Sequence, residues 1–62
     1  MKVTYRDRQV ELHGRRRVRD VIKEMGLVSQ AVLAVRNGKL VTDDVMLDED
    51  DEVKLVAVIS GG

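Results

Sequence analysis

The residues with the clearest chemical potential stand at the carboxyl end, where residues 57–62 read "AVISGG". A carboxylate is a poor electrophile, but adenylation of Gly62 by ATP would give its carbonyl carbon a good leaving group. Gly61 and Gly62 have no Cβ, so they permit close backbone approach and φ values that other residues avoid. Such a chain end could therefore enter a narrow opening in a partner protein. The alternative for this pair of glycines is a frayed terminus.

Three further groups of residues could carry chemistry, and each has a simpler interpretation. His13 is the only histidine and cysteine is absent, so no metal site is expected and His13 is predicted to lie at the surface. The acidic run at residues 48–52 lacks the D-x-D-x-D-G spacing of a calcium loop, so we expect a solvated turn, with partner docking as the alternative. The cluster of Arg15, Arg16 and Arg17 could contact phosphates, but a charge run where a helix begins is usually solvated.

Composition and charge narrow the class of protein. The chain has 62 residues, 44% of them apolar and 35% charged, which is typical of one small globular domain and leaves little room for an internal active site. There is no apolar run long enough to span a membrane, and no signal peptide or cysteine, so we expect a cytoplasmic protein. Residues 1–19 carry seven cations and two anions, whereas residues 41–62 carry one cation and seven anions. This bipolar charge argues against direct nucleic-acid binding and permits charged docking to a partner.

The hydrophobic pattern predicts the elements that must position the chain end. Residues 2–6 and 9–13 alternate and predict a β-hairpin with Asp7 and Arg8 between the strands. The spacing of Val18, Val21, Ile22 and Met25 predicts one short helix that ends at Gly26.

Three further strands are predicted after the helix. Asn37-Gly38 predicts a second hairpin, formed by the apolar run from Ala31 and by residues 39–41. Residues 42–47 are expected to form a turn or a single loose helical turn, and residues 53–59 a last strand. The predicted fold is therefore α+β: a β-β-α-β-β-β roll whose mixed sheet is covered on one face by a single helix, with residues 1–62 as one domain.

Two of the predicted strands are apolar on both sides. The set Val53, Leu55, Ala57 and Ile59 is assigned to the core, because these residues alternate with Val56 and Val58. The predicted strand that starts at Ala31 alternates in the same way. A single helix can cover only one face of the sheet, so the second sets are expected to form an exposed apolar patch, which usually marks an interaction surface. The patch residues are Leu33, Val35, Val56 and Val58.

The Gly-Gly end, the segment "AVRNGKLV" followed by an acidic turn, and the order of elements resemble the ubiquitin-like β-grasp superfamily. Within it, the chain is similar to the prokaryotic sulfur carriers of the ThiS type, the bacterial tRNA-thiolation carriers and the archaeal small modifier proteins. The MoaD family shares the Gly-Gly but is usually longer. One departure concerns the helix start, where relatives often place Thr or Ser and this chain has Arg17, which removes a side-chain cap.

The resemblance implies a function for the chain end. Gly62 would be adenylated by an E1-like enzyme with ATP, and a sulfur donor protein would convert it to a thiocarboxylate. That sulfur would pass to a thiazole synthase for thiamin or to a tRNA thiolase. The alternative is a protein modifier joined through Gly62 to target lysines, and a third possibility is a passive binding module.

The resemblance and the pattern together assign roles to the remaining residues. Leu33, Val35, Val56, Val58 and Ile59 would bind the partner, while Ser60 and Gly61 form the tail. The sequence offers no nucleophile–base pair, so neither catalysis nor a bound cofactor of its own is expected.

Overall fold

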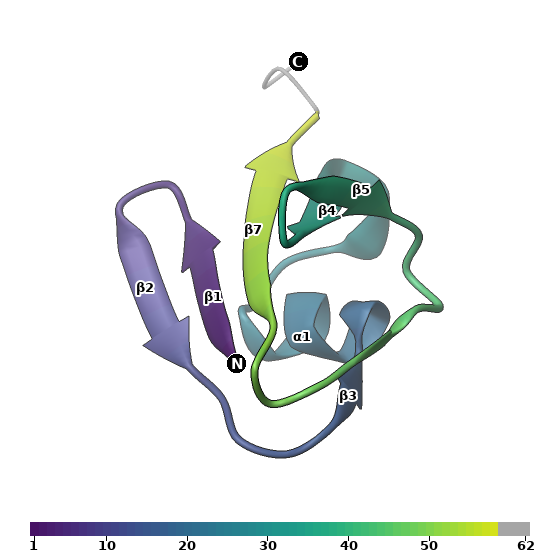
Figure 1. Cartoon of the computed structure of the whole chain (residues 1–62). Helices are drawn as coiled ribbons and strands as arrows, with labels where there is room; N and C mark the ends of the chain where they lie inside the picture. The colour runs from purple at the N-terminus through teal and green to yellow at the C-terminus, as the bar shows by residue number, and fades with distance from the viewer. Residues whose placement is uncertain (59–62) are drawn as a thin grey trace.

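The computed structural model describes residues 1–58. Ile59, which the sequence assigned to the last strand and to partner binding, lies outside the described residues. Ser60, Gly61 and Gly62, assigned to the tail and the reactive end, lie outside them too. Figure 1 shows the elements in chain order: β1 (Lys2–Tyr5), β2 (Arg8–Glu11), β3 (Arg16–Arg17), α1 (Val18–Glu24), the 3-10 helix η1 (Ser29–Ala31), β4 (Val32–Arg36), β5 (Lys39–Val41), β6 (Met46–Leu47) and β7 (Glu52–Ala57).

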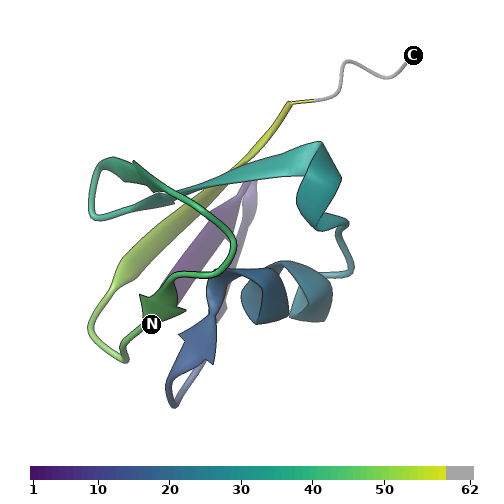
Figure 2. The same ribbon diagram turned by 90° about the vertical axis from the view of Figure 1, so that its right-hand side faces the viewer.

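The main sheet has five strands in the order β2-β1-β7-β4-β5. The last strand lies in its centre, parallel to β1 and antiparallel to β4. Helix α1 packs on one face of this mixed sheet (Figure 2). This arrangement is the β-grasp fold, so the predicted fold class is confirmed.

Helix α1 buries the face that its sequence spacing predicted. Val18, Val21, Ile22 and Met25 are at most 6% exposed. The helix ends at a Schellman motif, in which Gly26 has φ +78° and its N–H donates to the carbonyl of Lys23. The N–H of Leu27 donates to the carbonyl of Ile22. The predicted C-terminal glycine is therefore confirmed.

The start of α1 has no side-chain cap, as the arginine at this position indicated. Arg17 is the N-cap residue and makes no capping hydrogen bond with its side chain. Carbonyl groups from the loop after β5 replace it: the N–H of Val18 donates to Val45 O at 3.0 Å, and the N–H of Arg19 donates to Asp43 O at 2.9 Å. Two of the N–H groups that lack a partner within the helix are thus satisfied by a tertiary contact rather than by a local one.

The two hairpins were predicted, but the first has a different turn. Tyr5 pairs with Arg8, so the turn residues are Arg6 and Asp7 rather than Asp7 and Arg8. Arg6 adopts a φ of +55° in this turn, although it is not a glycine. The second hairpin turns at Asn37-Gly38, as predicted, and these residues have φ values of +49° and +84°, the geometry of a type I′ turn.

The prediction of a simple turn at residues 42–47 was wrong at its end. Met46 and Leu47 form β6, which pairs with Arg17 and Arg16 of β3 in a small second sheet. The side chain of Leu47 is fully buried in the core. Strands of two residues give too short an alternation to be recognised from the sequence, and this pairing joins segments that are distant along the chain.

The core lies between α1 and the inner face of the main sheet. Its strand residues include Val3, Val32, Ala34, Val53 and Leu55, all at most 5% exposed. The assignment of Val53 and Leu55 to the core is therefore confirmed. Ala57 was assigned to the same set but is exposed; β1 ends at Tyr5, opposite Leu55, so no residue of β1 lies beside Ala57.

Candidate functional site

The outer face of the main sheet has an apolar half beside the end of β7. Leu33 of β4 lies directly opposite Val56 of β7, and Val35 lies opposite Leu40 of β5. Leu33 is 44% exposed and Val56 41%, while Val35 is half-buried between neighbouring strands. We call Leu33, Val35, Leu40 and Val56 the apolar patch. The predicted exposure of this second face is therefore observed.

Leu40 belongs to this patch although the sequence analysis did not select it. It is 65% exposed, the highest value among the large apolar side chains of residues 1–58. The signal was present: a two-residue turn at Asn37-Gly38 fixes the pairing of Val35 with residue 40, so both side chains must share a face. The position could have been found by extending the register of that hairpin.

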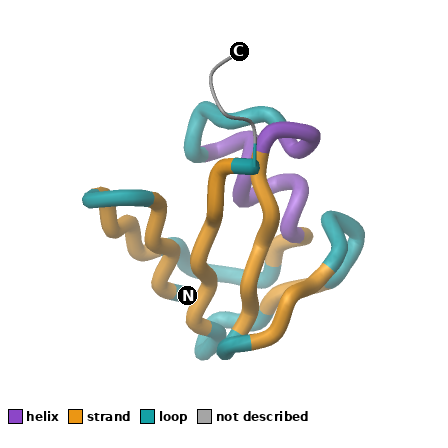
Figure 3. The backbone as a smooth tube through the Cα atoms, turned by 90° about the horizontal axis from the view of Figure 1, so that it is seen from above, coloured by secondary structure: helices purple, strands orange, loops and turns teal. Residues whose placement is uncertain are grey.

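Val58 lies just beyond β7 and is 47% exposed. Its N–H donates to the carbonyl of Ala31 at 3.0 Å, which fixes the backbone at the end of the described chain to η1. Figure 3 shows this end of β7 beside the start of β4. The hydrogen bonds of the sheet therefore hold the last described residue next to the apolar patch. Ile59, Ser60, Gly61 and Gly62 follow outside the described residues.

The other half of the outer face is polar. Lys2 lies opposite Glu11 on one side and Glu52 on the other, and Thr4 lies opposite Gln9. Cross-strand neighbours of opposite charge stabilise each other. The outer face is thus divided along β7 into a polar and an apolar half, and only the apolar half continues toward the end of the chain.

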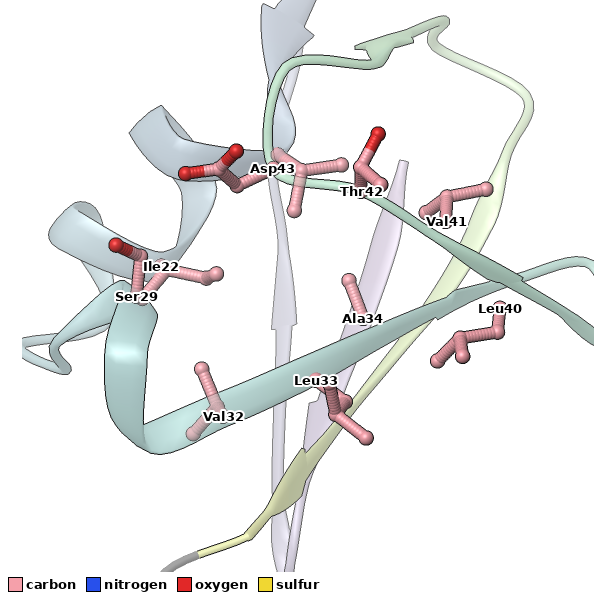
Figure 4. A pocket seen from close by; sticks show the side chains of 10 residues that line it. Ile22, Ser29, Val32, Leu33, Ala34, Leu40, Val41, Thr42 and Asp43 are labelled. Carbon is pink, nitrogen blue, oxygen red and sulfur yellow. The ribbon is translucent and has the colours of Figure 1, made fainter.

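A groove lies along the edge formed by β4 and β5, between these strands and α1, and Leu33 and Leu40 of the apolar patch also line it (Figure 4). It has a volume of about 340 Å³ and an aliphatic wall to which Ile22, Val32 and Val41 contribute. Ser29, Thr42 and Asp43 supply its polar atoms. Of these, Thr42 donates a hydrogen bond from Oγ1 to Asp44 Oδ1, a carboxylate of the same loop that does not line the groove.

The acidic run was predicted to be solvated, and this was wrong for Asp51. Its side chain is 7% exposed and accepts hydrogen bonds from Asn37 Nδ2 at 3.1 Å and from the N–H of Asp48 at 2.8 Å. Arg36 Nε lies 2.9 Å from Asp51 Oδ2. The N–H of Asp48, Asn37 and Arg36 together hold the pKa of Asp51 below its ordinary value of 3.8, against the opposing effect of burial. Asp51 thus joins the second hairpin to the start of β7.

The bipolar charge of the sequence is partly neutralised within the fold. Arg15 Nε lies 2.9 Å from Asp48 Oδ1, so the arginine cluster contacts the acidic run. His13 is a surface residue, as predicted, and its Nδ1 lies 3.5 Å from Glu49 Oε1. Within residues 1–58 no group of three potential metal ligands is gathered, and no helix is long and apolar enough to cross a membrane.

Comparison with known proteins identifies the family of this chain. The model of the ThiS family matches residues 2–62. The chain is also 38% identical over 55 residues to the sulfur carrier protein TtuB of Thermus thermophilus, a match that covers 89% of this chain and 85% of that protein. The chain belongs to the ThiS family. The family resemblance inferred from the Gly-Gly end and the order of elements is confirmed.

Proposed function

We propose that this protein is a sulfur carrier that uses the carboxyl group of Gly62. The observation that carries the proposal is the course of β7: the central strand leads from the core, beside an exposed apolar patch, directly toward residues 59–62. Membership of the ThiS family and the similarity to a protein named as a sulfur carrier support it. In this role the chain is a substrate of its partners rather than an enzyme.

The chemistry proceeds in two steps. A Gly62 carboxylate oxygen attacks the α-phosphorus of ATP, pyrophosphate leaves, and an acyl-adenylate forms. A sulfide-level nucleophile, supplied by the donor as HS⁻, then attacks the acyl carbon, the bond to the AMP oxygen breaks, and a thiocarboxylate remains. Both steps need an E1-like enzyme, because the described residues of this chain supply no group that could activate ATP.

The apolar patch is the proposed docking surface for that enzyme. Leu33, Val35 and Val56 lie on rigid strands, so a partner bound there would hold the following residues at a fixed distance from its own active site. Val58 extends this surface toward the tail, and Ile59 and Ser60 would guide Gly61 and Gly62 into the enzyme. Exposed apolar patches beside a rigid sheet are typical protein–protein contact sites.

Intact-mass spectrometry tests this proposal. The full chain is incubated with ATP, bisulfide and each adenylating enzyme of its own genome. Replacement of one oxygen by sulfur at the activated acyl group should raise the mass by about 16 Da. The matched control is the chain without Gly62, which should not change. If the full chain keeps its mass with every such enzyme, the carrier function is wrong.

The same adenylate could be attacked by a lysine amine, so a protein-modifier role is the second outcome of this chemistry. Trypsin cleaves after Lys54 and would leave residues 55–62 attached to a target lysine as a branched peptide. Such peptides in a digest of cells that express the chain would show that it is conjugated to proteins.

The sulfur acceptor, a thiazole synthase or a tRNA thiolase, is identified by deleting the gene of this chain and measuring thiamin dependence and thiouridine content.

A further inference from the structure

Lys54 occupies a distinctive position on the outer face of the sheet, at the boundary between its polar and apolar halves. On one side it lies opposite Val35 of the apolar patch, and on the other side opposite Thr4. Val56 follows two residues later on the same face. The ammonium group of an exposed lysine therefore stands beside the proposed docking surface, with an aliphatic side chain and a hydroxyl as its cross-strand neighbours.

The charges on this face are otherwise arranged in complementary pairs. Glu52 and Glu11 both lie opposite Lys2, which gives each carboxylate a cross-strand cation. Lys54 differs from Lys2 in that no carboxylate lies directly opposite it on either neighbouring strand. In a sheet, a charged side chain is stabilised by an opposite charge directly across from it on a neighbouring strand. The fold thus leaves this one cation on the outer face, within the described residues, without a counter-charge directly across the strands.

The surface is hollowed at this point. A shallow depression of about 580 Å³ has Thr4, Val35 and Lys54 in its lining, and Glu52, two residues before Lys54 on the same strand, also lines it. Its apolar wall is shared with the apolar patch through Val35. A partner that covers the patch must therefore also cover Lys54, and its side chains can enter the depression.

Covering an ammonium group with apolar surface is unfavourable unless the partner supplies a hydrogen-bond acceptor. A carboxylate is the strongest acceptor for this purpose, since a charge-assisted hydrogen bond is roughly twice as strong as a neutral one. The hydroxyl of Thr4 lines the same depression and offers a second donor to the same group. An apolar partner surface without an acid would offer neither donor an acceptor, and would leave Glu52 as the one carboxylate in the lining of the depression.

We infer that the activating enzyme presents a carboxylate side chain, within an otherwise apolar contact surface, to Lys54 and Thr4 in this depression. The inference rests on the proposed function, because it names the chemistry of the partner that the apolar patch receives. It assigns to Lys54 a role in partner selection: an enzyme with a lysine or arginine at the corresponding position would be rejected by like charge.

The test measures the apparent KM of the adenylating enzyme for the full chain, for four charge variants and for Val56→Asp by pyrophosphate release. Lys54→Met keeps the aliphatic stem and removes the charge, Lys54→Arg keeps the charge, and Lys54→Glu reverses it. Lys23→Glu on α1, at the other side of the molecule, is the control for net charge. Melting curves by circular dichroism establish that each variant is folded.

We expect Lys54→Met to raise KM on the order of tenfold with little change in kcat, and Lys54→Glu to raise it further. Lys54→Arg should stay close to the original chain, and Lys23→Glu should stay within about twofold, since surface charges outside a contact have small effects. Added salt should raise the KM of the original chain more than that of Lys54→Met, because salt screens the interaction with the carboxylate.

Two results would overturn the inference: the first leaves the proposed function intact, and the second contradicts the proposed function as well. If Lys54→Glu and Lys23→Glu give the same KM while Val56→Asp still raises it, the patch docks the enzyme without an acid at Lys54, and only this inference is wrong. If the original chain is adenylated by no enzyme of its genome, the proposed function fails and the inference fails with it.

Discussion

Asp51→Ala is expected to destabilise the fold strongly, although this residue lies in a run of acidic residues that looks solvent-exposed in the sequence. The Asp51 carboxylate accepts hydrogen bonds from Asn37 Nδ2 and from the N–H of Asp48, and it pairs with Arg36. Its backbone carbonyl accepts a hydrogen bond from the N–H of Lys2 at 3.2 Å. The side-chain contacts hold together the second hairpin, the acidic turn and the start of β7.

The magnitude follows from these contacts. Hydrogen bonds to a charged group contribute about 1.5–3 kcal/mol each, but Arg36 is one-third exposed and regains water when its partner is removed. The two hydrogen bonds from Asp48 and Asn37 then suggest a loss of about 2–4 kcal/mol, after allowance for non-additivity. A domain of this size has a total stability of about 3–9 kcal/mol, so the loss is a large fraction. The melting temperature should fall by roughly 10–25 °C.

The assay is denaturant titration followed by circular dichroism, with Asp50→Ala as the matched control. Asp50 is exposed, and within residues 1–58 its side chain makes no hydrogen bond, so its removal should cost less than about 0.5 kcal/mol. If Asp51→Ala and Asp50→Ala differ by less than about 0.5 kcal/mol, the contacts of Asp51 do not stabilise the fold, and the reasoning is refuted.

The contribution of Asp51 also depends on pH. Its pKa in the folded state is lowered below the ordinary value of 3.8, so the ionised form is favoured by folding. The stabilisation is present in full well above the unfolded-state pKa and is lost as the pH falls through 3.8 toward the lower folded-state value. Asp51→Asn cannot ionise, so the acid dependence of its unfolding free energy should be weaker than that of the original chain.

Three further outcomes are expected. Leu55→Ala removes a side chain that is 2% exposed and should cost about 2–5 kcal/mol in a denaturant titration, whereas a loss below about 1 kcal/mol would mean that the faces of β7 are assigned the wrong way round. Val56→Asp should remain folded and raise the KM for adenylation at least about tenfold, and Gln9→Asp, on the polar half of the same face, is its control. Normal adenylation of Val56→Asp would show that the apolar patch does not dock the enzyme. Gly38→Ala should cost about 1–2 kcal/mol because φ is +84° at this turn position, even though its Cβ would meet open space, and an unchanged melting temperature would contradict this.

Much of the fold was predictable because it depends on local periodicity and on backbone geometry. The spacing of Val18, Val21 and Ile22 determines the buried face of α1, since residues three and four apart share a helix face. Asn37 and Gly38 determine a type I′ turn, since few other residues adopt positive φ at both positions. That turn also fixes the register of β4 and β5, and with it the side of the sheet on which Leu40 lies.

The candidate site was predictable in part, for the same reason. Alternation along β4 and β7 separated Leu33 and Val56 from the core set, and the single helix implied that their face would stay uncovered. Alternation could not show which half of that face is apolar, because this depends on the order of strands in the sheet. Placing β7 between β1 and β4 puts Lys54 opposite both Thr4 and Val35, a position that no local pattern contains.

The sequence by itself thus determined the helix face, the turn at Asn37-Gly38 and the inward set of β7, because each depends on neighbours within a few residues. Only the tertiary structure decided which acid is buried, since Asp48, Asp50 and Asp51 are equivalent in sequence and only Asp51 meets Asn37 across 14 residues. It also decided how the helix start is capped, because the carbonyls that satisfy it belong to Asp43 and Val45, in a loop far along the chain. Such groups are selected by long-range packing, which brings donors and acceptors together only after the strands have paired.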